Sequence, residues 1–329
     1  MRSDDRRVVV AIIGGGFSGF MLAAHLDRRG IGCVVVEERV AVGVAYATDE
    51  PRHLLNVAAG QMSAWADEPD HFASWFGTAD AFAPRRDYRA YLQHIRAGLS
   101  PERVTVAPAR AVGAERDADG GWTVRLDDGS ALRADLLVLA QGNQPPEPLP
   151  GTEALQPPRY HNNPWTAAAE ADLARAARED RPVLLIGTGL TMIDSVLSLE
   201  AHGHRGTITA VSRRGLVPQS HRFDRRAIPE EIAPPPFGSL MRLWRHVRCE
   251  TRLRDWRSCV DALRPHSHAL WQSLSEADRR RFLRHARPWW DIHRHRIARR
   301  SARRSPRCAT RDGWWSRRGG SARWRTAAT

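Results

Sequence analysis

A short apolar run followed by a glycine-rich turn opens the chain. Residues 8–13 are unbroken in apolar character and rich in β-branched side chains, which is typical of a buried parallel strand. Glycine-rich residues 14–19 follow, and apolar residues then recur at helical spacing over 20–29. A second buried strand is predicted at 34–37. The first forty residues therefore predict a strand, a turn, a helix and a parallel strand.

The same pattern occurs a second time near the middle of the chain. Residues 182–186 form another apolar run, which we predict to be a buried strand, and the turn 187–189 follows it. A helix is predicted over 190–202 and a further strand over 207–211. Two β-turn-α-β units in one chain predict an α/β fold with two Rossmann-like dinucleotide-binding domains.

The intervening and following segments define the domain organisation. Short alternating strands over 104–140 predict a small meander that returns to the first sheet. Four prolines within 144–151 mark a crossover between domains, and 240–298 has helical periodicity. Four segments are predicted: an FAD-binding Rossmann-like domain with a meander at 1–150, an NAD(P)-binding βαβ segment at 151–233, a helical segment at 234–298, and an Arg- and Trp-rich disordered tail at 299–329.

Composition narrows the classes of protein that the chain can represent. The 329 residues are 42% hydrophobic, enough for a sizeable core, and no apolar run approaches the ~20 residues of a membrane helix. The net charge is +13, but residues 299–329 carry +9 of it. Four cysteines form no metal or disulfide spacing, and the histidines of 285–295 lack a further ligand. We expect a cytoplasmic protein without a metal or a membrane partner.

The first turn contains the G-x-G-x-x-G pattern of dinucleotide-binding folds. Gly14 makes the tight turn, Gly16 lets the backbone approach a pyrophosphate, and Gly19 allows close packing of helix on strand. The helix N-terminus offers free N–H groups to the phosphates. Glu37 ends the next strand, 18 residues after Gly19, where a carboxylate accepts hydrogen bonds from ribose hydroxyls.

The second turn repeats Gly187 and Gly189, but Met192 replaces the third glycine. The strand that follows ends in Ser212 and two arginines, Arg213 and Arg214, instead of an acid. Arginine binds a ribose 2′-phosphate that a carboxylate would repel, so the sequence favours NADPH over NADH here. The alternative is that these arginines only solvate a strand end.

One site selective for a ribose and one for a phosphate predict two different dinucleotides. We assign FAD to the first turn and NADPH to the second, because a flavin accepts hydride from a nicotinamide. The candidate cofactor-binding residues are Gly14, Gly16, Phe17, Ser18, Gly19, Glu37, Asn56, Ser63, Gln141, Gly142, Gly187, Gly189, Leu190, Thr191, Ser212, Arg213 and Arg214. Asn56 and Ser63 are predicted either to line the flavin or to make local turns. No catalytic acid or base can be named.

These residues resemble the bacterial FAD/NAD(P)-binding protein family, in which an NAD(P)H domain is inserted within an FAD domain. The resemblance covers about residues 5–298 and rests on 14–19, 43–46, 55–57, 62–72, 84–92, 137–143, 187–194 and 212–214. Broader relatives include N-hydroxylating and Baeyer–Villiger-type flavin monooxygenases. The resemblance implies that the strand before Gly142 contacts FAD, although Gln141 replaces the family's Thr. No cysteine lies in 40–65, where related disulfide reductases carry a redox pair.

The tail differs from the rest of the chain in composition. Residues 299–329 contain ten arginines and one acid, without apolar periodicity. A basic aromatic arm for nucleic acid is one interpretation, which we disfavour. A shifted reading frame is the other, because GC-rich codons for 305–316 read in another frame encode a helix end, a glycine and a strand start. The family resemblance then implies that the returning part of the FAD domain is missing.

The sequence therefore predicts an FAD-dependent oxidoreductase that takes hydride from NADPH and acts on a small molecule in a monooxygenase-like reaction. The alternative is a non-catalytic nucleotide-binding or redox-sensing protein, or an inactive truncated product. The substrate and the oligomeric state are not predicted.

Overall fold

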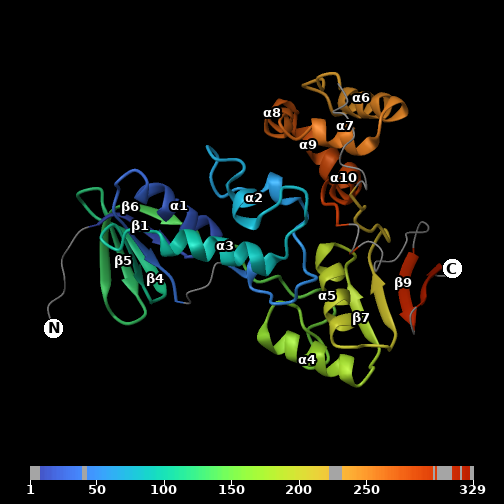
Figure 1. The fold of residues 1–329 in the computed structure, drawn as a ribbon, viewed down its shortest axis with the longest axis horizontal. Helices are drawn as coiled ribbons and strands as arrows, with labels where there is room; N and C mark the ends of the chain where they lie inside the picture. The colour runs from blue at the N-terminus through green and yellow to red at the C-terminus, as the bar shows by residue number, and fades with distance from the viewer. Residues whose placement is uncertain are drawn as a thin grey trace. The chain divides into compact units, whose positions relative to one another are not determined.

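The chain forms two compact units in a computed structural model (Figure 1). The structure describes residues 8–38, 43–221, 232–298 and 301, and the backbone of 313–318 and 321–326. The first unit contains Met1–His53 and Ala58–Glu170, and the second contains Leu54–Val57 and Ala171–Thr329. This division falls after Glu170, later than the proline-rich segment 144–151 at which the sequence places the crossover.

The first unit is built on a six-stranded sheet with the order β3-β2-β1-β6-β5-β4. Its strands are β1 (Val8–Ile13), β2 (Cys33–Val36), β3 (Val104–Ala107), β4 (Ala111–Arg116), β5 (Trp122–Leu126) and β6 (Ala131–Leu139). Strands β3, β2, β1 and β6 are parallel, whereas β5 pairs antiparallel with both β6 and β4. The predicted meander that returns to the first strand is confirmed.

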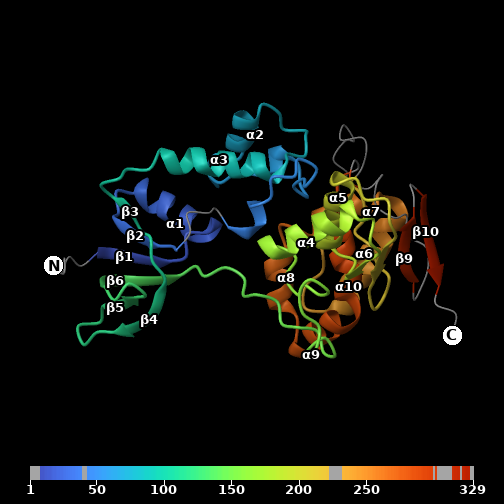
Figure 2. The same cartoon turned by 90° about the horizontal axis from the view of Figure 1, so that it is seen from below.

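The first unit contains three helices among its described residues, of which the sequence predicts the first, over 20–29. The helices are α1 (Phe17–Asp27), α2 (His71–Phe76) and α3 (Arg85–Ala97), and the short 3-10 turns are η1 (Val44–Tyr46) and η2 (Ala59–Gln61). Buried side chains of β1, β2 and α1 pack together on one face, and Figure 2 shows α1 and α3 on the same side of the sheet. The other face packs against residues of the meander. Strand β1 is therefore buried on both sides, as predicted.

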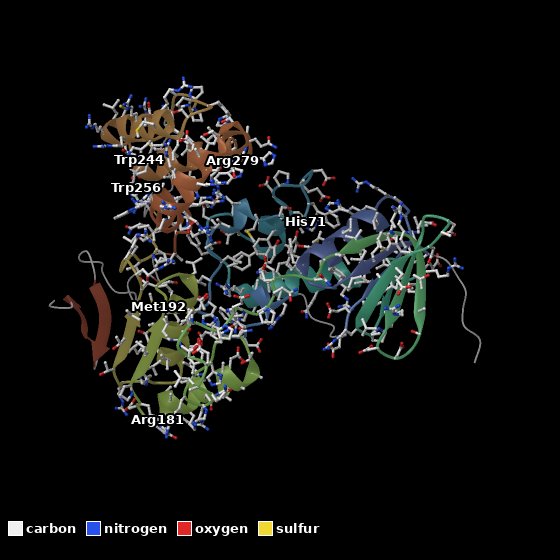
Figure 3. All side chains as sticks on the ribbon, turned by 180° about the vertical axis from the view of Figure 1, so that it is seen from behind. His71, Arg181, Met192, Trp244, Trp256 and Arg279 are labelled. Atoms are coloured by element: carbon white, nitrogen blue, oxygen red, sulfur yellow. The ribbon has the colours of Figure 1, made fainter. Side chains whose placement is uncertain are left out.

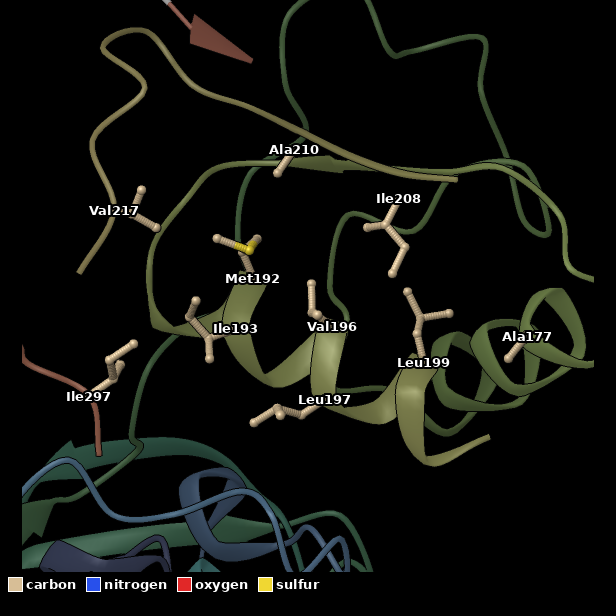
Figure 4. Packing of buried hydrophobic residues seen from close by; sticks show 10 residues of the cluster. All are labelled: Ala177, Met192, Ile193, Val196, Leu197, Leu199, Ile208, Ala210, Val217 and Ile297. Atoms are coloured by element: carbon tan, nitrogen blue, oxygen red, sulfur yellow. The ribbon is translucent and has the colours of Figure 1, made fainter. Parts of the chain in front are cut away.

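The second unit repeats the strand, turn and helix. Helix α4 (Ala167–Arg178) precedes β7 (Val183–Ile186), α5 (Leu190–Ala201) and β8 (Ile208–Val211), and β7 and β8 are parallel. Figure 4 shows Met192, Val196 and Leu199 of α5 directed at β8. Both predicted Rossmann-like units are thus present, which confirms the α/β fold class.

Strand β7 is not the buried strand that the sequence predicts. Leu184 and Ile186 are 60% and 54% exposed. Among the described strands β7 pairs only with β8, at the edge of a sheet ordered β10-β9-β8-β7. Helix α5 covers one face, where Val183 and Leu185 pack, so alternate side chains stay exposed.

A helical body follows, as the periodicity of 240–298 predicts. It contains α6 (Leu240–Leu253), α7 (Trp256–Ala262), α8 (Ser267–Ser273), α9 (Glu276–Arg281), the π-helical turn η3 (Phe282–Ala286) and α10 (Arg287–Arg294). Figure 3 labels Trp244, Trp256 and Arg279 in this body. A backbone bridge between Ser220 and Ile297 joins its end to the segment after β8.

The tail contains two described strands. Gly313–Arg318 and Ser321–Thr326 form the antiparallel pair β9 and β10, and β9 pairs with β8. The sequence predicts no regular structure there, so the backbone of these strands differs from that prediction. Apart from these strands and Ser301, residues 299–329 lie outside the described residues. Most of residues 305–316, on which the frame-shift hypothesis rests, are therefore not described. No described helix is long and apolar enough to span a bilayer.

Candidate dinucleotide-binding sites

The first glycine turn is held between the ends of two neighbouring strands. Gly14 has φ +103° and donates its N–H to Val36 O at 2.9 Å. A Cβ at Gly14 would lie 2.3 Å from Ala140 O. Only glycine fits this backbone angle and this approach. The turn therefore lies at the carboxyl ends of β2 and β6, the edge at which ligands bind in such sheets.

The second and third glycines of the motif have different surroundings. A Cβ at Gly19 would lie 1.9 Å from Gly14 O, so this glycine allows α1 to pack against the turn. At Gly16 the nearest atom to such a Cβ is Gly43 Cα, 3.9 Å away. Gly16 also caps α1 without a side-chain hydrogen bond, which leaves N–H groups for an anion. The open approach to the α1 N-terminus fits a pyrophosphate.

Glu37 lies directly against this turn. Its Oε2 accepts a hydrogen bond from Gly15 N–H at 2.6 Å, although the two residues are 22 positions apart. The carboxylate that follows β2 is thereby placed beside the phosphate-binding backbone. A ribose attached to a pyrophosphate at Gly16 has hydroxyls that such a carboxylate accepts. The residues around the first turn therefore fit the adenosine diphosphate part of FAD.

An aromatic cluster supports the start of α1, which the motif alone does not predict. The Phe17 ring lies 6.0 Å from Tyr46 and 6.5 Å from Tyr88, measured between centroids. Burial raises the pKa of both tyrosines above that of an ordinary phenol. Phe17 is 37% exposed, so its ring contacts these two rings on one side and remains accessible on the other. The tyrosine spacing within 85–97 marks a buried helix face but carries no signal for this contact with the turn.

The end of β6 also reaches the first turn. Gln141 Cα would lie 3.4 Å from a Cβ on Gly14, and Gln141 and Gly142 are both exposed. Ser18 is exposed on the first turn of α1. The structure thus brings together Gln141 and the glycine motif, as the resemblance implies. The contact of Gln141 with FAD stays a prediction.

Ser63 has local hydrogen-bond partners, whereas Asn56 bonds to a residue that is remote in the chain. The Ser63 hydroxyl donates to Glu68 O at 2.7 Å and accepts Trp65 N–H at 3.1 Å. The Asn56 carbonyl accepts Nε2–H of His221 at 2.7 Å, and Asn56 groups with the second unit. These bonds favour the turn-forming alternative for Ser63. The structure does not bring Ser63 to the glycine turn.

The second glycine turn is more open than the first. Gly187 has φ +108° and donates its N–H to Val211 O at 2.8 Å. A Cβ on Gly187 or Gly189 would meet no described atom within 4 Å. Met192, in place of the third glycine, is buried in the core. Leu190 is half-buried and Thr191 exposed at the start of α5.

Arg213 and Arg214 lie next to this turn and face solvent. Ser212 O accepts Gly215 N–H at 3.4 Å, so the two arginines occupy the centre of a tight turn after β8. Neither guanidinium has an ion pair or hydrogen bond with another described residue. Their charge and exposure fit a phosphate group.

Thr188 connects the two parts of this second site, and sequence analysis did not select it. Its Oγ1 lies 2.8 Å from Ser212 Oγ and 2.5 Å from Leu216 O, and the residue is 6% exposed. The only signal in the sequence is a hydroxyl residue between the two glycines. Elsewhere, the described residues contain no group of three or more side chains placed to hold a metal ion.

Comparisons with known proteins match parts of this chain. Residues 11–144 match the model of the FAD-NAD(P)-binding family. A Baeyer–Villiger monooxygenase of Streptomyces coelicolor is 26% identical over 202 residues, which are 59% of this chain and 33% of that protein. The Baeyer–Villiger monooxygenase ATR8 of Stachybotrys chlorohalonatus is 28% identical over 203 residues, covering 59% of this chain and 32% of that protein. The chain spans about a third of the length of these curated relatives.

Among solved structures, a cyclohexanone-bound cyclohexanone monooxygenase is similar. It is 22% identical, with a TM-score of 0.48, and the match covers 65% of this chain and 40% of the other. The family match and the curated relatives are the stronger findings. Residues 11–144 thus match an FAD-NAD(P)-binding family model, and part of the chain is similar to flavin monooxygenases.

Proposed function

We propose that this chain is an FAD-dependent oxidoreductase that uses NADPH as its hydride donor and acts on a small molecule in a monooxygenase-like reaction. One observation carries the proposal. Side chains of opposite charge lie beside the two glycine turns. Glu37 lies beside the first turn, and Arg213 and Arg214 lie beside the second. Opposite charges at the two ribose positions suit two different dinucleotides.

The residues of the chain bind and orient the two dinucleotides. The α1 N-terminus, open at Gly16, holds a pyrophosphate, and Glu37 accepts the ribose hydroxyls. The α5 N-terminus, capped by Gly189, holds the second pyrophosphate in the same way. Bound FAD supplies the acceptance of a hydride and its delivery to a further acceptor.

Selection of NADPH rests on the turn after β8. A 2′-phosphate carries up to two negative charges, and each exposed guanidinium there offers a planar fork of donors. The two arginines have no acidic partner among the described residues, so binding breaks no such ion pair. NADH lacks this phosphate and would gain nothing from them.

Reconstitution with FAD followed by anaerobic titration with NADPH tests the proposal. We expect a yellow protein whose flavin absorbance is bleached by NADPH and returns when air is admitted. A protein that takes up no FAD would overturn the flavoenzyme proposal. A protein that binds FAD and NADPH without bleaching would be the non-catalytic binding module instead.

A further inference from the structure

We propose that Thr188 is a positioning residue for selection of the 2′-phosphate, because its hydroxyl fixes the turn that presents Arg213 and Arg214. This inference rests on the proposed use of NADPH. Thr188 itself contacts no phosphate in this proposal. Its role is to hold the ends of the arginine turn.

The direction of each hydrogen bond around Thr188 follows from its chemistry. A carbonyl only accepts, so the Thr188 hydroxyl must donate its single hydrogen to Leu216 O, 2.5 Å away. The Ser212 hydroxyl must then donate to Thr188 Oγ1 across 2.8 Å. Ser212 Oγ in turn accepts Gly215 N–H at 3.1 Å. A single chain of bonds thus runs from Gly215 through Ser212 and Thr188 to Leu216.

This series of hydrogen bonds holds the loop on both sides of the two arginines. Ser212 precedes Arg213, and Gly215 and Leu216 follow Arg214. Thr188 belongs to the glycine turn after β7. Its nearly buried hydroxyl therefore joins this turn to the loop after β8. The next residue, Val217, is 3% exposed and packs in the core of the second unit, which anchors the far end. Arg213 and Arg214 therefore project from a turn fixed at both ends.

The same series of hydrogen bonds changes the role that we assign to Ser212. Its position at the end of β8 predicts that Ser212 is a cofactor-binding residue. Its hydroxyl hydrogen is already donated to Thr188, and its oxygen accepts Gly215 N–H. Ser212 therefore acts with Thr188 in shaping the turn, and the arginines supply the donors for a phosphate. A fixed turn loses less entropy when a ligand binds than a mobile one does.

Calorimetric titration of the full chain with adenosine 2′,5′-bisphosphate and with AMP tests the proposal without any flavin or turnover. Thr188→Val keeps the side-chain shape and removes the hydroxyl. We expect it to weaken binding of the bisphosphate ~10-fold, the effect of losing about one or two hydrogen bonds, and to leave AMP binding unchanged. Thr188→Ser restores the hydroxyl and should restore the bisphosphate affinity.

Two further variants test for a general loss of structure and for the shared series of hydrogen bonds. Ser195→Ala removes a hydroxyl that donates to Thr191 O on the same βαβ unit, and it should leave both affinities unchanged. Ser212→Ala breaks the chain next to Thr188. If both residues act through this chain, the double variant Thr188→Val with Ser212→Ala should bind the bisphosphate no worse than the weaker single variant.

The outcomes separate this inference from the proposed function. Equal loss of bisphosphate and AMP affinity in Thr188→Val, or no loss of either, would overturn the positioning role. Additive losses in the double variant would overturn the shared chain of bonds. A native chain that binds AMP as tightly as the bisphosphate would instead overturn the proposed choice of NADPH.

Discussion

Glu37 and Gly15 are joined by a hydrogen bond of 2.6 Å from the Gly15 N–H to the Glu37 carboxylate. The bond brings the end of β2 against the glycine turn after β1. A Cβ on Gly15 would lie 2.9 Å from Glu37 Cβ, so the close contact depends on glycine here. The bond therefore fixes the carboxylate that we predict to bind a ribose against the backbone that we predict to bind phosphates.

Glu37→Gln should weaken FAD binding more than it weakens the fold. The amide oxygen can still accept Gly15 N–H, but the charge that strengthens bonds from ribose hydroxyls is lost. A hydrogen bond to a charged group contributes about 1.5–3 kcal/mol, so we expect the FAD dissociation constant to rise roughly 10-fold to 100-fold. Quenching of flavin fluorescence on titration measures it.

Glu38→Gln is the matched control for this variant. Glu38 is the next residue, but its carboxylate is half-exposed and pairs with Arg110 at 3.1 Å. Exposed ion pairs contribute little to stability, so this change should leave FAD affinity as it is. Equal effects of the two variants would show that charge near the site, and not the position of Glu37, governs binding.

Gly16→Ala and Gly19→Ala should fail in different ways. At Gly19 the new Cβ would meet Gly14 O at 1.9 Å, so we expect a large drop in unfolding temperature. At Gly16 the Cβ has open space, and φ is −66°, which alanine adopts freely. We expect Gly16→Ala to fold normally and to bind little FAD. Thermal unfolding and flavin content, measured on the same samples, separate the two effects.

The order of elements in the first unit could be predicted because its signals are local. The apolar run of β1, the glycine spacing and the acid after β2 each fix a short segment, and the parallel sheet then brings their ends together. The contact between Phe17 and the rings of Tyr46 and Tyr88 could not be predicted in this way. It joins distant segments, and no spacing rule relates them.

The exposure of β7 escaped prediction for a similar reason. Its four apolar residues match a buried strand, but burial depends on what lies beside the strand and on both faces. Leu184 and Ile186 alternate with the covered residues, so they remain exposed where only one face is packed. The role of Thr188 was missed because its partners, Ser212 and Leu216, are remote in the chain.

Replacing Arg213 and Arg214 together by serine should raise KM for NADPH far more than KM for NADH. The two guanidinium groups are exposed beside the second glycine turn, and only the 2′-phosphate can use them. Each charged hydrogen bond that is lost weakens binding ~10-fold or more. Steady-state oxidation of both cofactors measures the ratio. Equal rises in both KM values would show that the arginines do not read the 2′-phosphate.

Asp278 links two helices of the second unit, so its loss should lower the stability of the helical body. Its N–H donates to Ser275 Oγ at 3.1 Å, so Ser275 is the N-cap of α9. In a capping box its carboxylate would accept the Ser275 N–H, but here it accepts Leu240 N–H at 3.1 Å and so caps α6. Asp278→Ala should lower the unfolding midpoint, whereas Glu276→Ala, at an exposed ion pair, should not.

The pH dependence of this cap has a definite sign. The bond from Leu240 N–H, followed by the bond from Arg281, lowers the pKa of Asp278 below its ordinary value. The folded state therefore holds the proton less tightly than the unfolded state. The contribution is present above the ordinary pKa of the carboxyl and is lost as the pH falls through the lowered value. Unfolding midpoints of the Asp278→Ala variant and the native chain should converge over that acidic range.

Cys33 should resist alkylation in the folded chain, whereas Cys249 should react. Cys33 lies buried on β2, and burial, assisted by Asp27, raises its pKa to about 11. Only about one thiol in a thousand is then ionised at pH 8, and the thiolate is the reactive form. Cys249 is exposed on α6. Peptide mapping after iodoacetamide treatment at pH 8 should find label on Cys249, and label on Cys33 only after denaturation.

The raised pKa of Cys33 makes the fold less stable at high pH. The unfolded thiol ionises near its ordinary pKa, while the folded thiol keeps its proton until about pH 11. Between these values the unfolded state binds fewer protons, so the free energy of unfolding falls as the pH rises through that window. Cys33→Ala removes this term, and its unfolding midpoint should fall less between pH 9 and 11 than that of the native chain. Identical slopes for the two proteins would place the pKa of Cys33 near that of an exposed thiol.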